Sequence, residues 1–322
     1  MIYVSRRLII TCLLLLIACV MAGVWGLRSG AVTLETSQVF AALMGDTPRS
    51  MTMVVTEWRL PRVLMALLIG AALGVSGAIF QSLMRNPLGS PDVMGFNTGA
   101  WSGVLVAMVL FGQDLTAIAL AAMVGGIVTS LLVWLLAWRN GIDTFRLIII
   151  GIGVRAMLVA FNTWLLLKAS LETALTAGLW NAGSLNGLTW AKTSPSAPII
   201  ILMLIAAALL VRRMRLLEMG DDTACALGVS VERSRLLMML VAVVLTAAAT
   251  ALAGPISFIA LVAPHIARRI SGTARWGLTQ ARCAGRCYCW WPISAPNNCL
   301  CRINFRLASL PSASAVFTLS SC

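Results

Sequence analysis

The chain has 322 residues, of which 60% are hydrophobic and 11% are charged, and its mean hydropathy is +0.93. Soluble globular proteins are about 45–50% apolar and about 25% charged, so this composition excludes a soluble enzyme and a disordered chain. The formal net charge of +13 does not indicate a nucleic-acid-binding module, because the basic residues lie between long apolar runs instead of clustering on a polar face.

Eight apolar segments are expected to form helices. In chain order they cover residues 8–26, 61–82, 94–112, 115–138, 145–167, 197–211, 236–253 and 255–267. A spanning helix needs about 20 mostly apolar residues, and within lipid a helix satisfies its own backbone hydrogen bonds. The predicted fold class is all-α, a polytopic transmembrane helix bundle in one domain over residues 1–280. The first segment exceeds the apolar core of about 7–15 residues in a signal peptide, so we expect an uncleaved span; cleavage is the alternative.

The distribution of Lys and Arg predicts the orientation, because short cytoplasmic loops carry an excess of both residues. If the N-terminus is cytoplasmic, thirteen arginines lie inside and six basic residues lie outside. The inside set is Arg6, Arg7, Arg85, Arg139, Arg146, Arg212, Arg213, Arg215, Arg233, Arg235, Arg268, Arg269 and Arg275, and the outside set is Arg28, Arg49, Arg59, Arg62, Lys168 and Lys192. We therefore predict a cytoplasmic N-terminus, with the long polar connections 27–60 and 168–196 outside.

Small residues crowd several of the apolar segments. They are concentrated at 70–78, at Gly125 and Gly126, at Gly151 and Gly153, and at 247–249. Because lipid gives helices no hydrophobic reason to associate, close approach through small side chains is a main source of packing. The pattern predicts a compact bundle.

Two connections on the predicted inner side carry unusual chemistry. Between residues 81 and 95, Pro87 and Pro91 forbid a continuous helix; irregular backbone near a membrane is tolerated where it is buried in protein or lines a cavity, and a simple turn is the alternative. Between residues 220 and 229, Asp221, Asp222 or Thr223 is expected to cap a short helix that Gly228 ends. Such a helix suits docking into a groove on a partner. A metal site at the paired aspartates is a weaker alternative, since no further acid or histidine lies nearby.

His265 is the single histidine of the chain, in a segment that also contains Gly254 and Pro264. A hydrogen-bonded structural role is favoured over a ligand or a catalytic base, because no converging zinc ligands or oriented partner is evident. The sequence contains no Gly-x-x-x-x-Gly-Lys-Ser/Thr phosphate-binding loop, so energy for uphill transport must come from a separate subunit or a coupled ion. Ion-coupled carriers place acids within their spans, whereas these acids lie in loops or near span ends, which favours the separate subunit.

These motifs together are what the chain shares with a known family. The matching pieces are Arg59-Leu60-Pro61-Arg62, the run from Gln81 to Gly95 with Arg85-Asn86-Pro87-Leu88, the loop from Gly220 to Gly228, and the run from Gly254 to Arg268 with Pro264-His265. The chain resembles the iron-siderophore and vitamin B12 permeases of type II ATP-driven importers, the FecCD family, over residues 1–280. Within the family it is most similar to a ferric enterobactin permease subunit, which implies that cargo; neither composition nor spacing shows the substrate.

The resemblance implies a subunit of the bacterial cell inner membrane that pairs with a second, homologous permease. Two ATPase subunits would bind ATP and Mg, so that this chain holds no cofactor and no metal, and would dock on a coupling loop that contains Gly220, Asp221, Asp222, Ala224, Leu227 and Gly228. A periplasmic siderophore-binding protein would dock on Arg59 and Arg62, for which anchoring to lipid phosphates is the alternative. Thr144 and Phe145 match the inner gate of the family weakly.

Two other function classes remain at this point. An ion-coupled secondary transporter would transport without an ATPase subunit, and an intramembrane enzyme would need paired catalytic groups that the sequence does not offer. Nucleic acid is not an expected partner, whereas membrane lipid is.

Residues 281–322 differ from the rest of the chain, with six Cys, four Arg, no acid and no long apolar run. A metal site is one interpretation of Cys283, Cys287 and Cys289. The favoured one is a membrane segment read out of frame, because CTG-type Leu codons read one base out give Cys or Trp, and GCG-type Ala codons give Arg. We therefore expect an unstructured tail where the family has two further spans.

Overall fold

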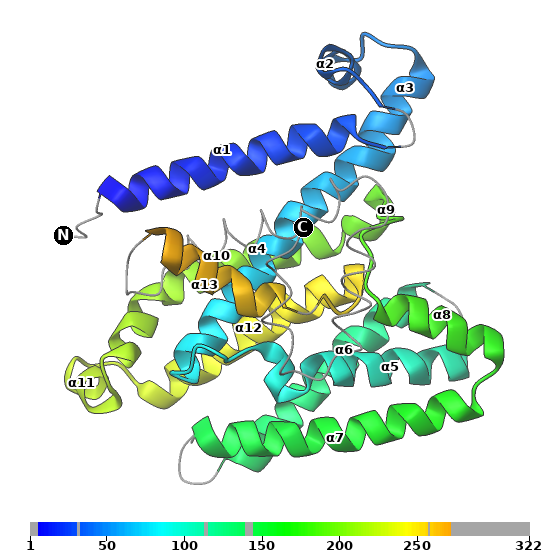
Figure 1. Cartoon of the computed structure of the whole chain (residues 1–322). Helices are drawn as coiled ribbons and strands as arrows, with labels where there is room; N and C mark the ends of the chain where they lie inside the picture. Colours follow the sequence, from blue (N-terminus) through cyan, green and yellow to red (C-terminus); the bar gives the residue numbers. More distant parts are fainter. Residues whose placement is uncertain (1–5, 31–32, 113–114, 139–143, 257, 272–322) are drawn as a thin grey trace, which may run out of the picture.

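The computed structural model describes residues 6–30, 33–112, 115–138, 144–256 and 258–271 (Figure 1). The predicted tail over 281–322 lies outside these residues. The long helices are α1 (Arg6–Arg28), α4 (Leu60–Leu83), α5 (Phe96–Phe111), α6 (Leu115–Ala137), α7 (Thr144–Lys168), α10 (Ser196–Glu218), α12 (Val231–Ala253) and α13 (Ile259–Ser271). The shorter elements are α2 (Thr36–Met44), α3 (Arg49–Met53), the π-helix η1 (Val54–Arg59), the 3₁₀-helix η2 (Pro91–Met94), α8 (Leu171–Asn181), α9 (Trp190–Thr193) and α11 (Asp221–Ala226).

The eight predicted apolar segments all form helices, but they are not equivalent. Within the described ranges, six helices are long and apolar enough to cross a membrane. Helix α5 has 16 residues and α13 has 13. At about 1.5 Å per residue, α13 reaches only about 20 Å, less than the hydrocarbon thickness of about 30 Å. Within the described residues, the eighth segment, which is also the short one in the sequence, is a short helix.

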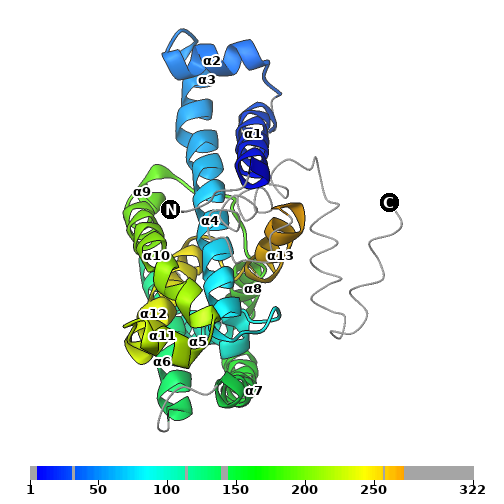
Figure 2. The same ribbon diagram turned by 90° about the vertical axis from the view of Figure 1, so that its left-hand side faces the viewer.

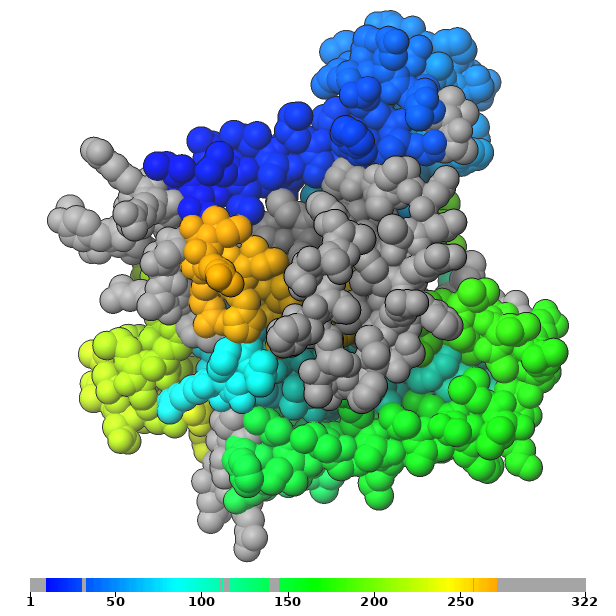
Figure 3. Space-filling model, viewed as in Figure 1, coloured from blue at the N-terminus to red at the C-terminus, as the bar shows by residue number. Residues whose placement is uncertain are grey.

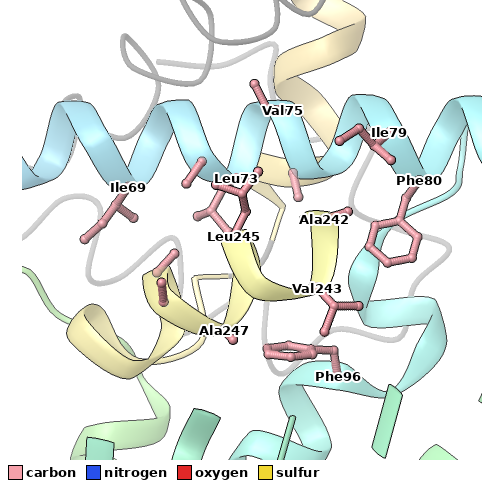
Figure 4. Close-up of a cluster of buried hydrophobic side chains, with 14 of the residues drawn as sticks. Ile69, Leu73, Val75, Ile79, Phe80, Phe96, Ala242, Val243, Leu245 and Ala247 are labelled. Atoms are coloured by element: carbon pink, nitrogen blue, oxygen red, sulfur yellow. The ribbon is translucent and has the colours of Figure 1, made fainter. Parts of the chain in front are cut away.

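Helix α4 is the central element of the bundle. It runs between α12, α13 and α10 and alongside α1 (Figures 1 and 2), and 83% of its most apolar window is buried. Leu73 of α4 lies beside Leu245 of α12, and Phe80 of α4 and Phe96 of α5 lie on the side of Val243 of α12 (Figure 4). The Ser76 hydroxyl, which is buried in the same interface, lies 2.7 Å from the Thr246 hydroxyl and donates to the carbonyl oxygen of Ala242 at 2.9 Å. Because lipid is itself apolar, such van der Waals and hydrogen-bonded contacts hold the helices together.

Close packing through small residues is confirmed for most of the predicted positions. Residues 70–78 and 247–249 are buried. A Cβ atom at Gly125 would overlap the carbonyl oxygen of Gly99 on α5, and one at Gly126 would overlap the ring of Phe96. Gly153 is the exception, because it has no heavy atom near its missing side chain.

Proline shapes the entry to α4, where the sequence suggested only a polar connection. Helices α3, η1 and α4 form one continuous helical stretch from Arg49 to Leu83. Pro61 has no N–H, and the N–H of Leu60 bonds to the carbonyl of Val55, five residues earlier. The Thr56 carbonyl instead accepts a hydrogen bond at 2.8 Å from the indole Nε1–H of Trp190 on α9. The π-helical turn is thereby tied to the polar connection 168–196.

Candidate functional site

Three segments that the sequence singled out meet at one end of the bundle. We call this region the motif junction; it comprises residues 81–95, 217–235 and 261–268. It lies where α4 ends and α11 projects, on the side opposite α2 and α8 (Figure 1). The first segment is more than 100 residues of sequence away from the other two, so only the tertiary fold unites them.

An ion-pair network centred on Asp221 joins two of these segments. Nη2 of Arg85 lies 2.6 Å from Oδ1 of Asp221, and Nη2 of Arg235 lies 2.9 Å from each carboxylate oxygen. Arg85 also donates to the Leu217 carbonyl oxygen at 3.1 Å. The end of α4 is thus linked to α11 and to the start of α12. In the sequence, Arg235 counted only toward the topology. It lies 14 residues after Asp221 at the start of the next long helix, and this proximity in the chain was the signal for a pair.

Hydrogen bonds around His265 join α13 to the same loop. The His265 ring Nε2 lies 2.8 Å from the Pro87 carbonyl oxygen, and Nδ1 lies 3.1 Å from Nη2 of Arg268. Donation from Nε2–H to the carbonyl leaves Nδ1 free to accept from Arg268. Arg268 also donates to Gln81, whose amide Nε2 donates to the carbonyl of Leu261 at 2.9 Å. His265 therefore has the hydrogen-bonded structural role that we expected.

Helix α11 presents some of the predicted coupling residues to solvent and buries others. Asp222, Leu227 and Gly228 are exposed, whereas Ala224 is fully buried and Asp221 is engaged in the ion pairs. The expected side-chain cap is wrong: Gly220 is the N-cap residue, and no side chain caps the helix. Asp221 turns to the two arginines instead, because their charge offers stronger hydrogen bonds than a backbone N–H. Gly228 does follow the end of the helix, with a φ of 78°.

The predicted coupling set missed three exposed positions on the same helix. Thr223, Cys225 and Ala226 face solvent beside Asp222. In so short a helix the exposed set depends on how α11 sits against α10 and α12, and the local sequence carries no such information.

The loop from 84 to 95 is irregular, as its prolines predict. The Asn86 side chain accepts a hydrogen bond from the N–H of Leu88 at 2.9 Å, and Pro91 opens η2. Gly95 has a φ of 70°, and a Cβ there would lie in van der Waals contact with Arg155 of α7. The loop therefore packs directly on α7.

Asp92 occupies a polar niche within this loop. The side-chain amide nitrogen of Asn97 donates to the Asp92 carboxylate, and the side-chain amide oxygen of Asn97 lies 3.5 Å from the hydroxyl of Thr250 on α12. Burial raises the pKa of Asp92 to about 6, while the charge of Arg155 and the bond from Asn97 oppose that rise.

The other predicted residues lie apart from the motif junction. Arg59 and Arg62 are half-buried at the α2 end of the bundle, where Nη1 of Arg59 donates to the carbonyls of Leu27 and Arg28 at 2.8 and 3.1 Å. Arg59 thereby caps the last turn of α1, a role that the sequence did not suggest.

Two predicted positions begin or end helices. Thr144 opens α7, and the side chain of Phe145 is 70% exposed beside it. Gly254 ends α12 with a φ of 73°, and a Cβ there would crowd the carbonyl oxygen of Trp180 in α8.

Comparison with known proteins identifies the family. A model of the FecCD transport family matches residues 14–291. The chain belongs to the FecCD family. Relatives include the ferric enterobactin transport system permease protein FepG of Escherichia coli (strain K12), 96% identical over 285 residues that cover 88% of this chain and 86% of the relative. FepD of the same organism, also a ferric enterobactin permease protein, is 37% identical and covers 85% of this chain and 83% of the relative.

The FecCD assignment agrees with a solved structure. A metal-chelate type ABC transporter in an inward-facing conformation superposes with a TM-score of 0.74 at 26% identity, covering 88% of this chain and 87% of that one. The predicted polytopic helix bundle is thereby confirmed.

Proposed function

We propose that this FecCD chain is the permease subunit of an ATP-driven importer that carries ferric enterobactin from the periplasm to the cytoplasm. The observation that carries the proposal is the 96% identity to FepG, whose name states that cargo. The relation to FepD supports pairing with a second, different permease in the inner membrane. A cytoplasmic N-terminus, inferred from thirteen arginines against six basic residues, puts α11 and the motif junction at the cytoplasmic end of the bundle.

The motif junction is the proposed docking site for the ATPase subunits. An exposed six-residue helix, α11, stands on a base fixed by Asp221 to both Arg85 and Arg235. A push on α11 would therefore be passed to α4, the central helix, and to α12. ATP and Mg would bind the ATPase, since the sequence has no phosphate-binding loop of its own.

Docking on α11 is tested by co-purification of the ATPase with the permease. Leu227, whose side chain is 58% exposed, is replaced in Leu227→Arg, and the matched control is Leu171→Arg on α8, 77% exposed at the opposite end. We expect Leu227→Arg to lose the ATPase and Leu171→Arg to keep it. Equal retention by both variants would contradict docking on α11.

Uptake in cells without the ATPase subunit distinguishes this proposal from the alternative, an ion-coupled secondary transporter. Cells that contain the two permeases but lack the ATPase subunit should show no uptake of labelled ferric enterobactin. Uptake that persists there, and collapses when the ion gradient is dissipated, would favour the secondary transporter.

A further inference from the structure

Arg155 places a positive charge at the middle of a spanning helix. It lies 11 residues after the first residue of α7 and 13 before the last, or about 16 and 20 Å from the two ends at 1.5 Å per residue. Helix α7 is also the least buried of the six candidate spans, with 17% of its window buried. Its exposed length forms the lower edge of the molecule in Figure 3.

Arg155 is exposed, and among the described residues its side chain forms no salt bridge. Within the described part of the chain, its guanidinium lies within 4 Å of no carboxylate; its electrostatic partner is the Asp92 carboxylate in the neighbouring loop. Ala156, the next residue in the helix, is exposed as well. The guanidinium therefore keeps donors free for another anion.

Irregular backbone reaches the same depth. A Cβ at Gly151 would overlap the carbonyl oxygen of Val93, and Gly95 lies within van der Waals reach of Arg155, so the loop with η2 lies along α7 as far as its middle. Non-helical backbone at membrane depth occurs where it is buried in protein or lines a water-filled cavity, and charged residues there face the same environments. Both features favour a protein-lined or water-lined environment over lipid at the middle of α7.

We propose that Arg155 lines the transport pathway and binds negatively charged oxygens of the cargo as it passes. The proposal rests on the proposed function and deepens it. A catecholate complex of Fe³⁺ is anionic because its phenolate oxygens outnumber the charge of the metal. The guanidinium offers several donors to such oxygens.

Uptake by the complete importer tests whether transport requires the positive charge of Arg155. We expect Arg155→Gln to lower ferric enterobactin uptake at subsaturating cargo by about tenfold or more, the size of one charge-assisted hydrogen bond, and Arg155→Lys to retain most of it. The matched control is Lys168→Gln at the end of the same helix, which should transport normally. ATPase activity stimulated by the loaded binding protein should persist in all variants, because the coupling end is untouched. Normal uptake by Arg155→Gln would overturn the proposal.

Assembly and labelling exclude the competing explanations. Loss of the second permease on purification of Arg155→Gln would assign the residue to a subunit interface and overturn the proposal. In a cysteine-free chain, Arg155→Cys should react with a membrane-impermeant anionic thiol reagent and be protected by cargo; Val128→Cys, on the charge-free span α6, should react slowly. Equal, slow reaction at both would place position 155 in lipid. A wild-type importer that takes up no siderophore would contradict the proposed function instead.

Discussion

Gly77 on α4 lies directly against the carbonyl oxygen of Ala260 on α13, so that a Cβ at position 77 would overlap it. Pro264 sits four residues beyond Ala260 and has no N–H to give that carbonyl. We expect Gly77→Ala to push α13 away and lower the thermal stability in detergent, whereas Gly178→Ala, a helical glycine in open space, should not. An unchanged melting temperature for Gly77→Ala would show that α13 packs elsewhere.

The two arginines that contact Asp221 should contribute unequally to the stability of α11. Arg235 contacts both carboxylate oxygens of Asp221 and its side chain is 16% exposed, whereas Arg85 contacts one oxygen and is 48% exposed. Exposed pairs contribute about 1 kcal/mol or less, so Arg235→Gln should speed amide hydrogen exchange in α11 more than Arg85→Gln does. The reverse order would mean that the loop after α4, rather than α12, fixes the coupling helix.

Asp92 should make stability depend on pH. Its pKa of about 6 in the folded chain exceeds its ordinary value of 3.8, so the folded state binds a proton that the unfolded state releases. Stability should therefore rise as pH falls from about 7.5 to about 5.5, by on the order of 1 kcal/mol. In Asp92→Asn this contribution should be missing. Melting both proteins in detergent across this range checks the difference, and parallel curves would contradict it.

Substitutions at Arg59 and Arg62 should have different effects, one on stability and the other on docking of the binding protein. Arg59→Ala loses two hydrogen bonds from a charged donor to the end of α1. We therefore expect the free energy of unfolding to fall by about 1–3 kcal/mol, which a lower melting temperature would show. Arg62→Gln should weaken capture of the periplasmic binding protein, because it removes charge from the outer face. If Arg62→Gln captures the binding protein as well as wild type does, the docking assignment fails.

The Cys-rich tail stays a prediction that nucleotide sequence can test. Resequencing the gene around codons 279–282 should reveal a frame in which apolar spans follow residue 280. A stoichiometric metal ion bound by the purified chain, and lost on replacing Cys283, Cys287 and Cys289, would support the metal site instead.

The positions of the helices and breaks were legible in the sequence because they depend on local chemistry. Apolar runs of spanning length identified the helices, and Pro87 and Pro91 identified the irregular loop. The chain of motifs from Arg59 to His265 indicated the family, which the 96% identity to FepG bears out. None of these inferences requires knowledge of which segments touch.

The partners of the polar groups were decided by the tertiary structure alone. Asp221 was expected to cap its own helix, but two arginines brought in by α4 and α12 compete more strongly for its carboxylate. Arg59 was expected to face outward and dock the binding protein, yet the end of α1 provides carbonyls that accept hydrogen bonds from it. A carboxylate or guanidinium takes the best partner within a few ångströms, and packing of distant segments determines which partner that is.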